Sequence, residues 1–162
     1  MLPDYVVARE KARQQYDAAF HLLNVTFPLI KDHKLLLGVM YNLFSSLEAS
    51  MDAILAYERQ LRLVPFSYDH DFRSKINLFR SRSAVRNKIP TEFINLMLDL
   101  GEILEIHKKG PIEFQRGNKL IICGPDYHVK TISLKELQEY LTLAKQFYNH
   151  MDRITAQLAK NG

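Results

Sequence analysis

Residues 35–61 read LLLGVMYNLFSSLEASMDAILAYERQL, and this stretch decides the fold. No charged residue occurs between positions 35 and 47, so neighbouring elements must cover this part on all sides. The pattern predicts a long helix at about 33–63 that is either the central helix of a bundle or part of a dimer interface. Its apolar residues recur near the 3.5-residue period of packed helices, at Leu36, Met40, Leu43, Leu47, Met51, Ile54 and Leu61.

Four more helices are predicted from apolar residues three, four or seven apart. Pro28 should end or bend the first helix near position 26, because proline has no N–H to donate. Ser133 and Glu136 form a capping box that begins the last helix. The predicted helices cover about 4–25, 71–86, 90–109 and the segment from 134 onward.

Residues 112–132 change to a period of two with β-branched and aromatic residues, which predicts strands. Gly117-Asn118 fits a two-residue hairpin turn between strands at 112–116 and 119–123, and a third strand is predicted at 127–131. The sequence therefore predicts a single mainly α domain over 1–162. Its architecture is an up-and-down bundle of about five helices, with a small antiparallel β-hairpin insert at about 112–132 before the last helix.

Composition limits the class of protein. The 162 residues are 47% hydrophobic and 25% charged, as in ordinary globular domains, and the formal net charge is +4. The single cysteine, Cys123, favours a reducing compartment, and no apolar stretch approaches the roughly 18 residues of a membrane span. Without a secretory signal at the start, we expect a cytoplasmic protein with no membrane partner.

Motifs for common catalytic sites are absent from the sequence. It has no glycine-rich phosphate loop and no His-Glu-x-x-His pair, and its six histidines never fall three or four apart. We therefore expect no metal and no cofactor, and the sequence favours a protein that is not an enzyme.

Three weaker candidates for chemistry remain. Asp69-His70-Asp71 could act as the acid–base cluster of a metal-independent nuclease, or Asp71 could simply cap the next helix. Cys123 could be a nucleophile, but it reads more simply as a strand residue that faces the core. Glu48, Asp52 and Glu58 could share a site, or form the solvated edge of the long helix.

The helix at about 71–88 gives the strongest indication of function. Residues 59–90 contain eight Lys or Arg against two Asp or Glu. Such a ridge could neutralise several phosphates, and the planar fork of arginine suits phosphate well. The alternative is a solvated helix face that is neutralised by the acidic segment 91–106. The candidate nucleic-acid-binding residues are Arg73, Lys75, Arg80, Arg82, Arg86 and Lys88.

The hairpin region adds further cations and aromatic rings that could stack on bases. Lysines on edge strands also serve simply to prevent aggregation, so both interpretations stay open. The cations are Lys108, Lys109, Arg116, Lys119 and Lys130, and the rings are Phe114, Tyr127 and His128.

Residues 35–58 (LLLGVMYNLFSSLEASMDAILAYE) and 134–147 (LKELQEYLTLAKQF) resemble HEPN-type domains, all-helical bundles often found in prokaryotic toxin–antitoxin and RNA-related systems. The ribonucleases of that family carry an arginine followed four to six residues later by a histidine on one helix. Arg62 and His70 are too far apart for this motif and are separated by Pro65. The resemblance therefore implies a catalytically silent member that dimerises, or that binds RNA or a partner protein.

These observations favour a non-catalytic binding module whose ligand is RNA or another polyanion, held by the basic helix. The main alternative is a structural or protein-interaction homodimer built on the helix at 33–63, without nucleic acid. A nuclease that uses Asp69 and His70 with the neighbouring arginines is the third hypothesis.

Overall fold

The computed structural model describes residues 2–110, 112–125 and 128–156. Within these ranges the chain forms five continuous helical segments and one small sheet, which confirms the predicted mainly α class. Two of the helices contain a π-helical turn, written η. The segments are α1 (Asp4–His21) with η1 (Leu22–Thr26) and α2 (Phe27–Ile30), α3 (Lys34–Gln60), α4 (Phe72–Leu78) with η2 (Phe79–Ser83) and α5 (Ala84–Arg86), α6 (Thr91–Lys109), and α7 (Leu134–Thr155).

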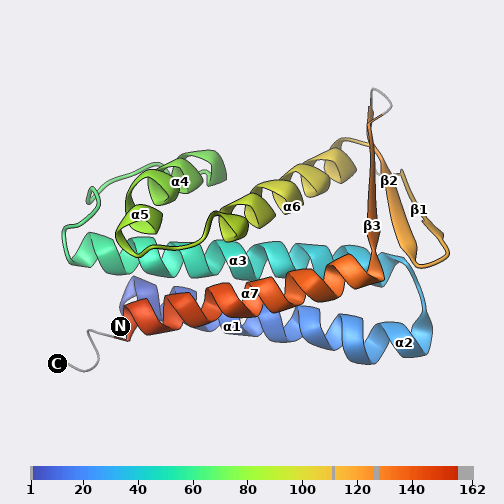
Figure 1. Ribbon diagram of the computed structural model, residues 1–162, viewed down its shortest axis with the longest axis horizontal. Helices are drawn as coiled ribbons and strands as arrows, with labels where there is room; N and C mark the ends of the chain where they lie inside the picture. The colour runs from blue at the N-terminus through green and yellow to red at the C-terminus, as the bar shows by residue number, and fades with distance from the viewer. Residues whose placement is uncertain (1, 111, 126–127, 157–162) are drawn as a thin grey trace.

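Helix α3 is the central helix of the bundle. In Figure 1 it runs along the long axis, with α1 and α7 beside it on one side and α4, α5 and α6 on the other. Met40, Leu43 and Ile54 are completely buried, because helices on both sides cover them. None of the helices in the described ranges combines the length and the hydrophobicity that a membrane span requires.

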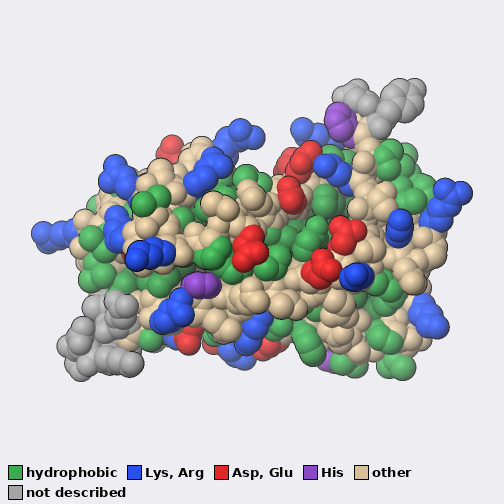
Figure 2. Space-filling model, viewed as in Figure 1, with side chains coloured by type: hydrophobic (Ala, Val, Ile, Leu, Met, Phe, Trp, Pro, Cys, Tyr) green, Lys and Arg blue, Asp and Glu red, His purple; other side chains and the backbone are tan. Residues whose placement is uncertain are grey.

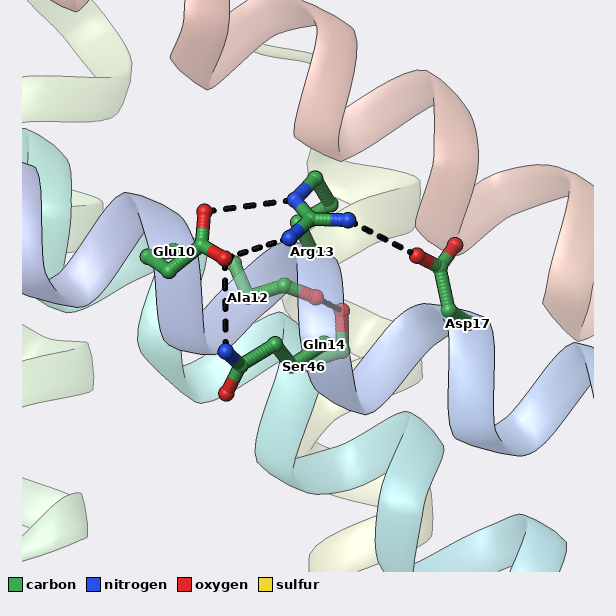
Figure 3. A network of polar contacts seen from close by, with 6 residues as sticks. All are labelled: Glu10, Ala12, Arg13, Gln14, Asp17 and Ser46. Atoms are coloured by element: carbon green, nitrogen blue, oxygen red, sulfur yellow. Dashed lines mark hydrogen bonds and ion pairs between the residues drawn. The ribbon is translucent and has the colours of Figure 1, made fainter.

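Helices α1 and α3 meet through small side chains. Ala12 and Ala19 on α1 are fully buried, and the Ser46 hydroxyl on α3 donates a hydrogen bond of 2.8 Å to the Ala12 carbonyl (Figure 3). Small residues let two backbones come close, and this bond satisfies a hydroxyl that has lost its water. On the solvent side of α1, Arg13 bridges Glu10 and Asp17.

The first helical segment continues past Pro28, so of the two outcomes predicted near position 26, an end or a bend, the end is wrong. The regular α-helix is instead interrupted there by η1. Pro28 cannot donate to the carbonyl of Asn24, and in an α-helix its ring would collide with that carbonyl. The π-helical turn η1 widens the helix just before the proline, and the Phe27 N–H donates to Leu22, five residues back. The segment ends only at Lys31, which adopts a left-handed conformation with φ of +57°.

The sheet stands at one end of the bundle (Figure 1) and contains β1 (Ile112–Arg116), β2 (Lys119–Cys123) and β3 (Val129–Ser133). All neighbouring strands are antiparallel in the order β1-β2-β3, and Gly117 takes the positive φ of +61° that its turn requires. The third strand lies two residues later than predicted, and Tyr127 falls outside the described residues. Buried Leu120, Ile122 and Ile132 attach the sheet to the helices.

Candidate functional site

Lys75, one of the six predicted cations, faces α3 and not the solvent. Its side chain is only 8% exposed, and Nζ lies 2.8 Å from Asp52 Oδ1 and 3.6 Å from Glu48 Oε2. Burial alone would lower its pKa, but the two carboxylates outweigh burial and raise the pKa above that of a solvated lysine. Lys75 therefore belongs to the packing of α4 on α3.

Arg86 is also committed to α3. Its Nη1 lies 2.6 Å from Oε2 of Glu58, a carboxylate with 1% exposure, and Nη2 donates to the Leu63 carbonyl at 3.0 Å. Asn87 Nδ2 donates to the same Glu58 oxygen at 3.2 Å. Arg86 thus neutralises a buried acid and holds the chain that follows α3.

These contacts correct the prediction for the acidic residues. The sequence left open that segment 91–106 neutralises the basic helix, and that Glu48, Asp52 and Glu58 either share a site or form the solvated edge of the long helix. Instead Lys75 and Arg86 pair with those three acids of α3. The spacing of the two cations indicates this arrangement. Residues 75 and 86 are eleven apart, about three helical turns, so they share a face of the helix and can both meet α3.

The other four predicted cations point to solvent. These four side chains are exposed, and none forms an ion pair with any residue that the structure describes. They are Arg73, Arg80, Arg82 and Lys88. Arg80 Nη2 donates to Asn77 Oδ1 at 2.8 Å, which orients that side chain. Arg73 and Arg80 are seven apart and lie on the same side of the helix.

Arg73 and Arg80 line an open groove between α4–η2 and the second half of α6. The volume of the groove is about 890 Å³, and α3 forms its floor. Lys108 and Lys109 line it from the end of α6, so cations stand on both walls. Figure 2 shows this side of the molecule, with Lys and Arg side chains over α4 and side chains of both charges over the end of α6.

Aromatic side chains form part of the floor of the groove. Phe44 of α3 and Phe72 of α4 meet edge to face, with ring centroids 5.0 Å apart. Tyr41, one turn before Phe44, also lines the groove and is 45% exposed. Gly101 of α6 lies against both phenylalanines, and a Cβ at this position would come within 3.3 Å of the Phe44 ring.

Three glutamates also line the groove, and two of them lie near a lysine, although Lys75 is shared with Asp52. Glu48 lies 3.6 Å from Lys75 Nζ, and Glu102 lies 3.6 Å from Lys130 Nζ. Glu105 forms no ion pair within the described ranges. The groove lining therefore holds four cations and three carboxylates. Its positive charge is concentrated at Arg73 and Arg80, which form no ion pair within the described ranges.

The Asp69-His70-Asp71 cluster is not assembled as an acid–base site. Asp71 Oδ2 accepts from the Ser74 amide at 3.0 Å and caps α4, and this bond lowers the pKa of the Asp71 carboxyl. The exposed His70 ring packs near Tyr68, with centroids 4.9 Å apart. The structural interpretation of Asp71 is thus confirmed.

Cys123 lies on the outer face of the sheet, so the prediction that it faces the core is wrong. It pairs across the strands with Ile112 and Val129, which are both exposed, because the alternation of β2 places Leu120 and Ile122 inside. Across the part of the chain that is described, no three His, Cys, Asp or Glu side chains are grouped so that they could hold a metal ion.

The remaining hairpin candidates do not come together in one place. Lys130 pairs with Glu102, whereas Arg116 and Lys119 face each other beside the hairpin turn. Phe114 is exposed on the sheet, His128 is exposed beyond it, and Tyr127 falls outside the described residues. Only Lys108 and Lys109 of this group join the groove.

The surface predicted for a homodimer is largely covered by the chain itself. In the charge-free half of α3, Leu36, Val39 and Met40 are buried by the neighbouring helices. Comparison of the chain with protein-family models, with curated proteins and with solved structures found no match. The HEPN-type resemblance and the homodimer therefore both stay predictions.

Proposed function

We propose that this chain is a non-catalytic binding module whose ligand is RNA or another polyanion. The observation that carries the proposal is the pair Arg73 and Arg80, which are exposed and have no carboxylate partner among the residues that the structure describes, across a groove from Lys108 and Lys109. Two walls of cations can contact successive phosphates of one strand. Each phosphate contact releases condensed counterions, which supplies affinity at low salt.

The proposal assigns different tasks to the six cations of the basic helix. Lys75 and Arg86 hold the helix on α3, and their charges are already used by its acids. Arg73 and Arg80 present the planar guanidinium fork that suits phosphate oxygens. Arg82 and Lys88 are exposed outside the groove and are expected to add only long-range attraction.

A salt titration of RNA binding tests the proposal. Fluorescence anisotropy of a labelled single-stranded RNA should show that the logarithm of the binding constant falls linearly with the logarithm of the salt concentration. The double variant Arg73→Ala/Arg80→Ala should bind more weakly, and its slope should shrink by roughly 0.7 for each lost phosphate contact.

The matched control removes the same charge from exposed residues on the α1 and α7 side. Lys11→Ala/Arg153→Ala loses two cations that do not line the groove, and it should keep most of the wild-type affinity and slope. Equal binding by wild type and the groove variant, or equal losses in the two variants, would reject the proposed site.

A further inference from the structure

We infer that the groove accepts a base of single-stranded nucleic acid on its aromatic floor, while the cations on its walls hold the phosphates on either side. This inference rests on the proposed function and narrows it to one class of polyanion. The aromatic floor is defined as Tyr41, Phe44 and Phe72.

The floor has the composition of a stacking site. Tyr41 and Phe44 project from adjacent turns of α3, and Phe72 meets them from the first turn of α4. Tyr41 exposes 45% of its surface and is the most accessible of the three. Phe44 and Phe72 are half-buried, and they pack on each other and against Gly101. Aromatic faces exposed in a basic groove are the usual platform for unpaired bases.

Shape favours a single strand over a duplex. The groove is a hollow of about 890 Å³ between two helical walls, within the range of roughly 300–1,000 Å³ for ligand pockets. In a duplex the bases are stacked and paired, so it would present only its backbone to the cations and leave the rings in water. In a single strand, an unstacked base can turn outward from the backbone and stack on those rings.

The charge arrangement matches a base with a phosphate on each side. Arg73 and Arg80 stand on the α4–η2 wall, and Lys108 and Lys109 on the α6 wall, with the rings between them. A strand that crosses from one wall to the other would therefore meet cations before and after the base.

The first experiment compares ligands of equal charge with and without bases. The probes are oligouridine and oligothymidine of about twelve nucleotides, a size within the roughly 4–16 of known single-strand sites, and an abasic strand with the same number of phosphates. Both base-containing strands should bind at least about fivefold more tightly than the abasic strand. A shorter duplex with the same total number of phosphates should bind no better than the abasic strand, because its bases are paired and stacked.

The second experiment removes one exposed ring. Tyr41→Ala should weaken oligouridine binding by roughly fivefold or more and change abasic-strand binding by less than about twofold. Phe72→Leu keeps an apolar side chain and should show the same selectivity, with folding checked by circular dichroism. The control is Phe20→Ala, which removes a 48% exposed ring on α1 and should change neither affinity.

The outcomes separate the inference from the proposed function. If the abasic strand binds as tightly as oligouridine and Arg73→Ala/Arg80→Ala weakens both, the groove binds phosphates alone and the inference fails. Tighter binding by an acidic peptide that contains phenylalanine would also overturn it and assign the groove to a protein partner. If neither the strands nor another polyanion such as heparin binds at low salt, the proposed function itself is wrong.

Discussion

At the scale of single residues, Glu58 and Arg86 show why charges in the sequence cannot simply be counted as surface charges. Glu58 is almost completely buried at the end of α3, and Arg86 and Asn87 both donate to its Oε2. A buried carboxylate without a cation would pay a large desolvation cost. Arg86 is therefore required by the fold, although its sequence position suggested a ligand contact.

Replacing Arg86 should destabilise the protein strongly. Arg86→Ala leaves Glu58 buried without its cation and should lower the free energy of unfolding by about 3 kcal/mol, the lower end of the range for such pairs because Arg86 is partly exposed. Arg82→Ala, four residues away and exposed, should change it by less than about 0.5 kcal/mol. Urea unfolding measures both. Similar losses in the two variants would contradict the assigned roles.

At the scale of elements, the positions of the helices and strands were largely predictable, because periodicity, caps and turn residues act locally. The capping box at Ser133 and Glu136 and the glycine turn at Gly117 are present as predicted. The errors arose where wider context decides. The first helix passes Pro28 through a π turn, and α3 ends at Gln60, earlier than its apolar pattern indicated.

The cap at Asp71 predicts how the start of α4 responds to pH. The Ser74 amide stabilises the charged carboxylate and lowers its pKa below the unfolded value of about 3.9. The stability from this cap is therefore present above about pH 4 and is lost as the pH falls through the lowered pKa of the folded state.

Thermal unfolding across this pH range tests the cap. Wild type should exceed Asp71→Ala in stability at pH 7, and the difference should disappear in acid. Asp71→Asn keeps a capping oxygen that does not titrate, so its advantage over Asp71→Ala should hold at all pH values. If the difference in stability between wild type and Asp71→Ala stays the same at low pH, the charge of the carboxylate plays no part.

At the scale of the whole molecule, the candidate site could be predicted only in part. The count of charges marked the basic helix, but it could not show which of its cations would meet the acids of α3. Arg73 and Arg80 remain candidates, whereas Lys75 has an internal partner. The opposite wall comes from a segment about thirty residues later, which only the fold brings near.

The aromatic floor was not predicted at all. Phe72 reads as part of the apolar stripe of its helix, and Phe44 lies in the charge-free half of α3, where every apolar residue suggested core. Their partial exposure depends on the separation of α4 and α6 above α3 (Figure 1), and this is a property of the assembled bundle.

Mapping amide chemical shifts during titration with oligouridine tests the central claim most directly, because it shows where the ligand sits without altering the protein. The account predicts shifts concentrated in residues 72–80, 98–109 and the turn of α3 that carries Tyr41 and Phe44. Arg82 and the exposed sheet residues Ile112 and Val129 should change little. Saturable shifts confined to the sheet or to α1 and α7, with the groove unchanged, would contradict it.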